Sequence, residues 1–474
     1  MHGLLLLAAV STFIGVSETD PNYFQTREGK TWVPVGCNIC FERMGLSNDE
    51  ARAKFDEWMT AFAANGGNFM RVWLSLPFTD IMPTKAYEFN PVAEANLKWM
   101  VSRAEELGLR LKFTLEHFRG MKDVTTEFKQ GIPGVISFQK PLYAPYARTV
   151  KDFFKSAECF DIYMAKARRM KELGLGDSPA VIAWETWNEI NSVGCATEDW
   201  FAWSVKANAA LRELFPNQMI LTNLGSFSTA GSFSAYDALA KLPINDYLQA
   251  HRYFDPGAEL DVCRGPMDVL CAETVRDLRT RRPQGGPVIL AETGAVERNH
   301  RIFSHRYELD KDGMLLHDEI FAAFFAGSAG TGQPWHWDHQ YISQHNLWWH
   351  FARFAKAIEG LDPAAEHFRP FYTETHRMRI WGLKGEKTTV GWCRDKSNTW
   401  ETEIETGRKP LPLTGEQLPK PVVGKAVCDG KAGVSWYHPW EDRTETASTR
   451  DVPAFTRSIV FRVEGTVGLT GVSR

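Results

Sequence analysis

Two stretches of the sequence decide the fold: AVIAWETWNEIN at residues 180–191 and PVILAETGA at residues 287–295. Each is a short apolar run followed by a carboxylate, Glu189 in the first and Glu292 in the second. Apolar runs of this length are typical of strands buried on both faces of a parallel sheet. A (β/α)8 barrel presents the C-terminal ends of its strands at one face, where residues remote in sequence meet. We therefore interpret the two stretches as strands four and seven of such a barrel.

The first 370 or so residues alternate short apolar runs with amphipathic stretches, which is the pattern of a parallel α/β fold. The predicted strands are residues 31–39, 68–74, 109–117, 180–187, 219–224, 247–253, 287–292 and 330–337. The helices predicted between them include residues 49–64, 93–107, 163–173, 200–215, 267–281 and 347–360. No glycine-rich phosphate loop such as GxGxxG follows an early strand, which disfavours a doubly wound nucleotide-binding sheet. Eight strands favour a TIM barrel, which we place at residues 22–372.

From about Thr375 the pattern changes to short β-type runs separated by turns rich in Gly, Asp and Pro. This pattern predicts a small antiparallel β-sandwich at residues 375–474. The proline-rich stretch at residues 409–421 resembles an interdomain linker, but strand-like segments lie on both sides of it. We interpret it as a long loop inside the sandwich.

The composition indicates a globular protein with one large and one smaller domain. The 474 residues are enough for a barrel of about 250 residues or more and a second domain of about 100. The mean hydropathy is −0.30, and no apolar run of about 18 residues follows the first twenty, which disfavours a multi-span membrane protein. The net charge of −4 gives no field that would attract nucleic acid, so we expect a neutral partner. The 17 tryptophans suit the stacking of sugar rings, although indoles serve hydrophobic cores equally well.

The N-terminus, MHGLLLLAAVSTFIGVSETD, has an apolar stretch and a small-x-small pattern at Gly15-Val16-Ser17. This favours a signal peptide at residues 1–17 and a secreted or periplasmic protein. Lys and Arg are missing before the apolar stretch, so an ordinary buried N-terminus is the alternative.

Eight cysteines are too few in this length for a disulfide scaffold. Cys37 and Cys40 form a CxxC, but no second Cys or His pair lies at zinc-like spacing, and packing is the favoured role. The pairs to test first as disulfides are Cys263 with Cys271 and Cys393 with Cys428.

Two carboxyl groups that meet at one end of a barrel suit the hydrolysis of a glycosidic bond. One carboxyl group donates a proton to the leaving oxygen, and the other attacks the sugar or activates water. An isolated Asn-Glu or Ala-Glu-Thr is weak evidence of such a site. The series Arg71, His117, Asn188-Glu189, His251-x-Tyr253, Glu292 and Trp335 is stronger, because these residues fall at successive predicted strand ends.

This series resembles clan A glycoside hydrolases, close to glycoside hydrolase family 5, and WETWNE at residues 184–189 resembles its mannanase-like branch. The β-rich tail is similar to the C-terminal sandwich of some bacterial members. The resemblance implies a retaining hydrolase of β-glycosidic bonds in a polysaccharide or oligosaccharide, of mannan or glucan type, that needs no cofactor and no metal. It also implies that Glu189 is the acid/base and Glu292 the nucleophile.

The two glutamates would then need opposite ionisation states. We expect Glu189 to stay protonated near neutral pH, because the charge of Glu292 disfavours its ionisation and raises its pKa. Glu292 must be ionised, which requires a cation or several donors around it. Arg71 is the natural candidate and matches the family's strand-two arginine; a structural pair with Glu185 or Glu116 is its alternative role.

Further residues are expected to bind or position the substrate. Asn188 would hydrogen-bond the sugar 2-hydroxyl, or else only form a turn. His251 and Tyr253 share one strand face, where the phenol would touch the nucleophile and the imidazole would contact the substrate or the acid/base. Such residues are also often satisfied core side chains. Trp335 and Trp337 are also two residues apart and should share one strand face. One of them would form the floor beneath the sugar beside the cleaved bond. His336 would then point away.

His117, at the end of strand three, matches a family position that lines the site, but the adjacent Glu116 leaves its register open. Long inserts at residues 119–154, 255–266 and 297–312 are expected to build or block subsites. Glu297 and His300 in the last insert would line the glycone side.

Two other classes of function remain open. A metal-dependent barrel hydrolase would use His336, Asp338 and His339 of WHWDH as ligands, but no early-strand HxH accompanies them. A non-catalytic carbohydrate-binding protein on the same scaffold is disfavoured because both glutamates are present.

Overall fold

Seven parallel strands form the inner wall of the larger domain. The computed structural model describes residues 12–42, 45–122, 138–338, 340–429 and 432–465. Five strands form one sheet in the order β4 (Gly36–Asn38), β5 (Phe69–Trp73), β6 (Arg110–Thr114), β7 (Val181–Glu185) and β8 (Met219–Leu221). The strands β9 (Leu248–His251) and β10 (Val288–Glu292) pair separately in parallel. Every residue of β5, β6, β7, β9 and β10 is buried, as expected of strands covered on both faces.

The barrel is closed by an irregular segment where the sequence predicts strand eight. Residues 330–337 form no regular strand and make one parallel bridge, between Pro334 and Thr293. The segment still joins both neighbours, because the Gln333 amide donates to the Leu290 carbonyl at 2.9 Å and the Pro334 carbonyl accepts from Asn38 at 3.1 Å. A Cβ on Gly332 would lie 2.2 Å from a backbone oxygen. This close approach and the missing proline donor prevent a regular ladder.

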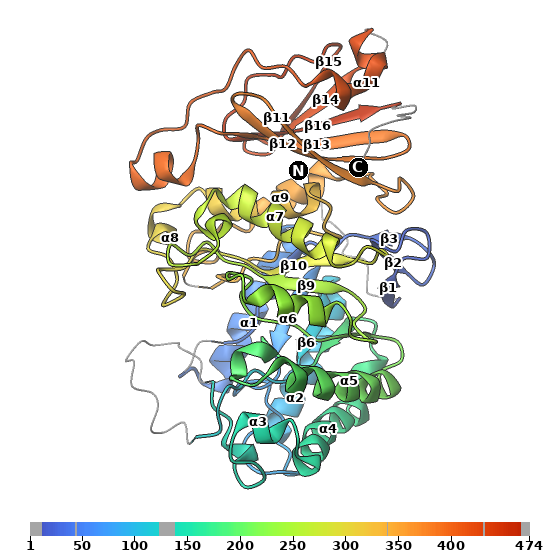
Figure 1. Cartoon of the computed structure of the whole chain (residues 1–474), viewed down its shortest axis with the longest axis vertical. Coiled ribbons are helices and arrows are strands. Elements are labelled where there is room, and N and C mark those ends of the chain that lie inside the picture. Colours follow the sequence, from blue (N-terminus) through green and yellow to red (C-terminus); the bar gives the residue numbers. More distant parts are fainter. Residues whose placement is uncertain (1–11, 43–44, 123–137, 339, 430–431, 466–474) are drawn as a thin grey trace.

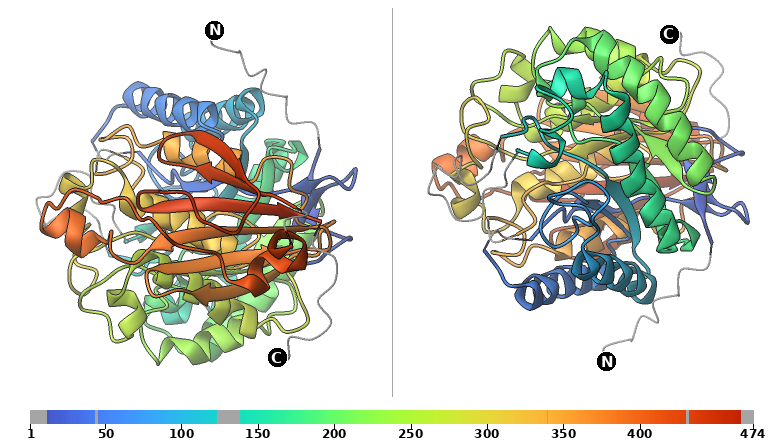
Figure 2. Two further views of the ribbon diagram at one scale, coloured as in Figure 1. Left: turned by 90° about the horizontal axis from the view of Figure 1, so that it is seen from above. Right: turned by 90° about the horizontal axis from the view of Figure 1, so that it is seen from below.

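Helices surround these strands (Figures 1 and 2). They are α1 (Asn48–Ala64), α2 (Pro91–Leu107), α3 (Val150–Phe153), α4 (Ala157–Glu172), α5 (Thr197–Leu214), α6 (Ser232–Leu239), α7 (Met267–Thr280), α8 (Arg306–Leu309), α9 (Met314–Phe325) and α10 (Trp349–Ala357). The predicted helices all lie within one to six residues of these bounds. Helix α1 begins at a capping box between Ser47 and Glu50. All twelve residues of α9 are buried, so it carries no amphipathic pattern.

The C-terminal domain is built on a six-stranded antiparallel sheet, drawn at the top of Figure 1. Its order is β11 (Arg369–Glu374), β12 (Met378–Lys384), β13 (Thr388–Asp395), β16 (Ser458–Glu464), β14 (Val434–His438) and β15 (Arg443–Ala447). One face packs on α7 and α9 of the barrel, and a second layer with Leu413, Leu418 and α11 (Lys420–Cys428) covers the other. The predicted class, a barrel followed by an antiparallel β-domain, is confirmed. The sheet begins at Arg369, before the predicted boundary at residue 375.

The N-terminal segment forms a small antiparallel sheet of β1 (Ile14–Val16), β2 (Phe24–Thr26) and β3 (Thr31–Trp32). Ile14 is buried in the main core, so processing after Ser17 would remove a packed strand. Residues 1–11 of the predicted signal peptide lie outside the described part of the chain, and export stays a prediction. No helix among the described residues has the length and apolarity of a membrane span.

All eight cysteines are free thiols, including the two pairs proposed as disulfides. Cys37 and Cys40 are fully buried in the barrel core, which is the packing role expected of them.

Candidate active site

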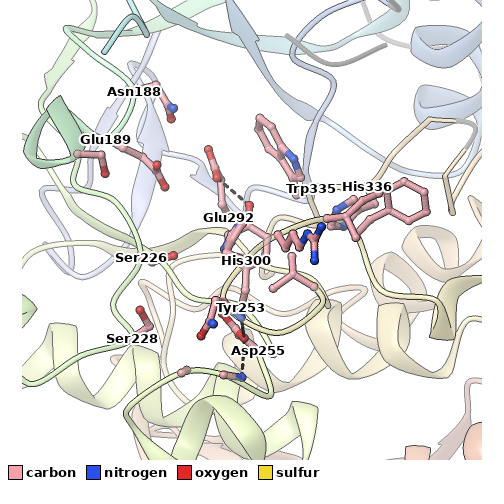
Figure 3. A pocket seen from close by; sticks show the side chains of 18 of the residues that line it. Asn188, Glu189, Ser226, Ser228, Tyr253, Asp255, Glu292, His300, Trp335 and His336 are labelled. Atoms are coloured by element: carbon pink, nitrogen blue, oxygen red, sulfur yellow. Dashed lines mark hydrogen bonds between the residues drawn. The ribbon is translucent and has the colours of Figure 1, made fainter. Parts of the chain in front are cut away.

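A cavity of about 770 Å³ opens at the C-terminal ends of the barrel strands (Figure 3). Residues at the ends of all eight strand positions or in the loops that follow them line it, among them Phe41, Trp73, Arg119, Glu189, Ser226, Tyr253, Glu292 and Trp335. This is the face at which barrel enzymes bind their substrates, and the volume suits a small molecule or a few sugar units. The N-terminal sheet is joined to the opposite end, where Arg110 at the start of β6 donates to the Thr12 carbonyl.

Glu189 is held in a strained and crowded position. Its backbone has φ 56° and ψ 55°, the left-handed conformation, and its amide donates to Asn223 Oδ1 at 2.6 Å. A Cβ on Gly225 would lie 2.6 Å from Ser192 Oγ and 3.1 Å from the carboxyl carbon of Glu189, so a side chain there would displace these groups. A backbone held in a sparsely populated conformation by its surroundings is a common feature of functional sites.

Glu292 ends β10 and faces the same cavity. An oxygen of Glu189, an oxygen of Glu292 and a ring nitrogen of His251 lie within 4.8 Å of one another. Tyr253 donates its hydroxyl to Glu292 Oε2 at 2.8 Å, and His251 Nδ1 lies 3.1 Å from the same oxygen. Arg71 donates to the other oxygen, Oε1. Each of these donors stabilises negative charge on Glu292.

Arg71 serves both roles that the sequence left open. It is fully buried and donates from Nε to Glu185 Oε1 at 3.0 Å, in addition to its bond with Glu292. It also donates to Asn188 Oδ1 at 2.8 Å, which orients this amide beside the cavity. Burial opposes the ionisation of Glu185, but the charges of Arg71 and Lys112 outweigh it and lower its pKa to about 2. The arginine is therefore fixed on one side by a structural ion pair and reaches the cavity on the other.

The ionisation of Glu189 differs from the sequence prediction. Burial raises the pKa of this carboxyl, but the hydrogen bond from His251 and the charge of Arg119 outweigh burial and lower the pKa to about 2. The expectation that Glu292 keeps Glu189 protonated is wrong for the unliganded protein. Arg119 Nη2 lies 2.5 Å from Glu189 Oε2. It begins the insert at residues 119–154, which the sequence assigned to subsites without singling out this residue.

His251 lies between the two carboxylates. Its Nδ1 is 3.0 Å from Glu189 Oε1 and 3.1 Å from Glu292 Oε2. Burial opposes its protonation, but the negative charge of Glu292 and the contact with Glu189 raise its pKa above the usual value. The proton that Glu189 lacks is thus held one hydrogen bond away.

The aromatic residues 335–337 do not show the alternation of side chains expected of a strand. Trp335 and Trp337 both line the cavity, but His336 between them does so as well. His336 Nδ1 contacts the Tyr307 hydroxyl at 2.9 Å, and burial lowers its pKa to about 3. The prediction that His336 points away is wrong, because the amide of Trp337 donates to the carbonyl of Trp335 at 3.0 Å in a tight turn.

The other predicted positions lie at different depths. His117 is buried behind the cavity wall, stacked on Trp73 with 5.0 Å between ring centroids, and its Nδ1 lies 2.5 Å from Ser75 Oγ. It is not among the residues that line the cavity. His300 does line it, packed on Tyr253 at 4.6 Å, whereas Glu297 pairs with His305 instead.

Glu189, His251 and Glu292 are also the described residues whose donor atoms are close enough to share a metal ion. These atoms already contact one another, and the guanidinium groups of Arg71 and Arg119 contact both carboxylates. Two guanidinium charges so close disfavour a third positive charge at this point. Of the alternative set, His336 is engaged by Tyr307, and His339 lies outside the described residues.

The comparisons with known proteins agree with this geometry. No family model matches the chain. The mannan endo-1,4-beta-mannosidase F of Aspergillus fumigatus is 28% identical over 126 residues, which is 27% of this chain and 25% of that protein. The chain therefore matches only about a quarter of the length of this curated relative.

Solved structures share the fold over nearly the whole chain. A glycoside hydrolase superposes with a TM-score of 0.58 at 13% identity and covers 96% of this chain and 97% of its own. An endo-beta-1,4-mannanase from Thermotoga petrophila gives a TM-score of 0.50 at 14% identity and covers 92% of each chain. The chain is thus similar in fold to these two enzymes, and over about a quarter of its length it is similar in sequence to a mannan endo-1,4-beta-mannosidase. This is the resemblance that the sequence motifs predicted.

Proposed function

We propose that the protein is a retaining β-glycoside hydrolase in which Glu292 is the nucleophile and Glu189 the acid/base. The observation that carries the proposal is the approach of the two carboxylates to within 4.8 Å across one cavity. Retaining enzymes place their carboxyl groups about 5–5.5 Å apart, whereas inverting enzymes leave room for a water at about 6.5–9.5 Å. The spacing here leaves no such room.

The first half of the reaction replaces the glycosidic bond by an ester to Glu292. A Glu292 oxygen attacks the anomeric carbon, while Glu189 gives a proton to the leaving oxygen. His251 Nδ1 lies 3.0 Å from Glu189 Oε1, so transfer of its proton generates the acid form. The Asn188 amide, oriented by Arg71, is available to hydrogen-bond the sugar.

The second half returns the enzyme to its starting state. Formation of the ester removes the charge of Glu292, and Glu189 now accepts a proton from water. The water oxygen bonds to the anomeric carbon from the face that the leaving sugar vacated, and the bond to Glu292 breaks, which frees its carboxylate. Glu189 then returns a proton to His251 Nδ1, 3.0 Å away, and the starting state is restored. Two displacements restore the original configuration of the sugar.

For the substrate we propose a β-linked mannan or mannooligosaccharide, with a glucan as the alternative. The support is that the Aspergillus fumigatus relative is a mannan endo-1,4-beta-mannosidase and the Thermotoga petrophila structure is an endo-beta-1,4-mannanase. Trp335, which is partly exposed, offers an indole at the cavity for a neutral sugar ring.

The stereochemistry of the product tests the mechanism. Proton NMR during cleavage of a β-1,4-mannooligosaccharide should show the β-anomer first, followed by mutarotation. The α-anomer as first product would contradict double displacement. Failure to cleave any of a panel of β-mannans, β-glucans and aryl β-glycosides would contradict the function itself.

Glu189→Ala tests the acid assignment. This variant should lose much less activity on a dinitrophenyl glycoside than on an oligosaccharide, because an activated phenolate leaves without protonation. The matched control is Glu198→Ala on the surface of α5, which should retain activity on both. Equal losses on both substrates would show that Glu189 is not the proton donor.

A further inference from the structure

Both carboxylate oxygens of Glu189 are occupied in the unliganded protein. Oε1 contacts His251 Nδ1 at 3.0 Å, and Oε2 contacts Arg119 Nη2 at 2.5 Å. A general acid must place one oxygen within about 2.6–3.2 Å of the atom that it protonates. One of the two partners must therefore leave before a glycosidic oxygen can approach.

Arg119 is the partner with freedom to leave. The His251 side chain is fully buried at the end of β9, whereas 35% of the Arg119 side chain is exposed on an irregular loop after β6. The Arg119 guanidinium lies 4.3 Å from the centroid of the Phe138 ring. Its Nε has no hydrogen-bond partner among the described residues, so Glu189 is its main polar anchor.

We propose that Arg119 occupies the position of the leaving-group sugar in the unliganded protein and moves off Glu189 when that sugar binds. This inference rests on the proposed function. It makes Arg119 a positioning residue: it keeps Glu189 ionised while the leaving-group subsite is empty and releases it when the subsite is filled. After release, the guanidinium remains beside Phe138, where it can donate hydrogen bonds to sugar hydroxyls.

The charges around Glu189 are consistent with such a coupling. The groups that face it are Arg119 from the loop after β6, His251 from β9, and Glu292 and His300 from β10 and the loop that follows. Burial raises the pKa of Glu189, and Arg119 is one of the groups that lower it. Departure of Arg119 therefore moves Glu189 toward the protonated form that a proton donor needs.

Arg119→Met, which removes the charge, is the main test, and Arg119→Gln is a second variant that keeps a hydrogen-bonding group. In the unliganded protein labelled with ¹³C at the glutamate carboxyls, the midpoint of the Glu189 signal should rise by about one pH unit or more. The signal is assigned by its loss in Glu189→Gln. Arg52→Met is the matched control, because Arg52 also stacks on an aromatic ring, Trp99 at 4.7 Å, remote from the cavity.

The kinetic counterpart separates the unliganded from the substrate-bound protein. In the wild type, kcat/KM and kcat should both fall at high pH, where the proton donor loses its proton. This alkaline limb should lie at lower pH for kcat/KM than for kcat, since kcat/KM reports the unliganded state. Arg119→Met should move the kcat/KM limb upward and narrow this gap. An unchanged titration midpoint in both folded variants, or an equal loss of activity at every pH, would overturn the inference. A wild type that cleaves no glycoside would refute the proposed function instead, and the titration would still show whether Arg119 controls the charge of Glu189.

Discussion

Two buried arginine–carboxylate pairs, one at the cavity and one between the domains, differ in what the carboxylate faces. At the cavity, Arg71 joins Glu185 in the core to Glu292, which lines the open space. Between the domains, Arg379 of the C-terminal sheet holds Asp268 of α7 at 2.6 and 2.8 Å, away from the cavity. The same chemical pair thus supports chemistry where one partner meets substrate and joins two domains where both are enclosed.

Histidines show the same contrast. The carboxylates around His251 raise its pKa, which favours its protonated form at the cavity. Between the domains, His317 and His350 contact each other at 3.3 Å, and burial lowers the pKa of both. The surroundings therefore favour the protonated form of the buried histidine at the cavity and the neutral, hydrogen-bonding form of those between the domains.

The largest effect should follow from Glu292→Gln. The variant keeps the shape of the side chain and the Arg71–Glu185 pair but removes the nucleophile, so kcat/KM should fall at least about 10⁴-fold, or about 5.5 kcal/mol. The urea unfolding curve should move little. Glu308→Gln, on the exposed face of α8 after the same strand, is the control and should remain active. Residual activity above one per cent would remove Glu292 from the nucleophile role.

Breaking the interdomain pair should lower stability and leave activity unchanged, which is the reverse of the effect of Glu292→Gln. Asp268→Asn leaves Arg379 buried without its counter-charge, which should lower the free energy of unfolding by about 3–5 kcal/mol. The activity of the folded fraction should stay near that of the wild type, because Asp268 does not line the cavity. Glu57→Gln, which breaks the exposed pair with Lys54, should cost less than about 1 kcal/mol. If both substitutions lowered the free energy of unfolding equally, the buried interdomain pair would matter no more to stability than an exposed pair.

The parts predicted correctly are those set by strand and helix periodicity. Strand ends placed Glu189, Tyr253 and Glu292 at one face, because parallel strands of a barrel share one direction. The sequence did not reveal α9, because a helix buried on all sides shows no alternation of apolar and polar residues. The prediction for His336 was wrong because the segment that closes the barrel is irregular and lacks the alternation of a strand.

Arg119 was missed for a different reason. It belongs to a loop without periodic pattern, and its importance comes only from its distance to Glu189. The prediction for Glu189 failed for the same reason, because burial and the charge of Glu292 raise its pKa less than His251 and Arg119 lower it. Electrostatics depends on contacts between remote segments, which local sequence does not encode.

The smallest effect concerns the interdomain histidines and pH. The contacts define one chain of neutral donors: Trp440 donates to Ser458, Ser458 to His317, His317 to His350, and His350 to the Asp312 carbonyl. The folded pKa values lie below the usual value, to about 3 for His350, so the unfolded chain binds more protons as the pH falls below about 6.5. The stabilisation is complete above that pH and is lost on acidification, by up to about 1.4 kcal/mol per pH unit for each histidine.

His350→Gln should remove the part of this pH dependence of stability that comes from His350. Between pH 6 and pH 5, the free energy of unfolding should fall by about 1 kcal/mol less in the variant than in the wild type, as measured by urea unfolding at each pH. The comparison cancels the titration of carboxylates common to both proteins. Identical slopes would mean that the histidine is protonated within the folded interface, and the contrast with His251 would then be lost.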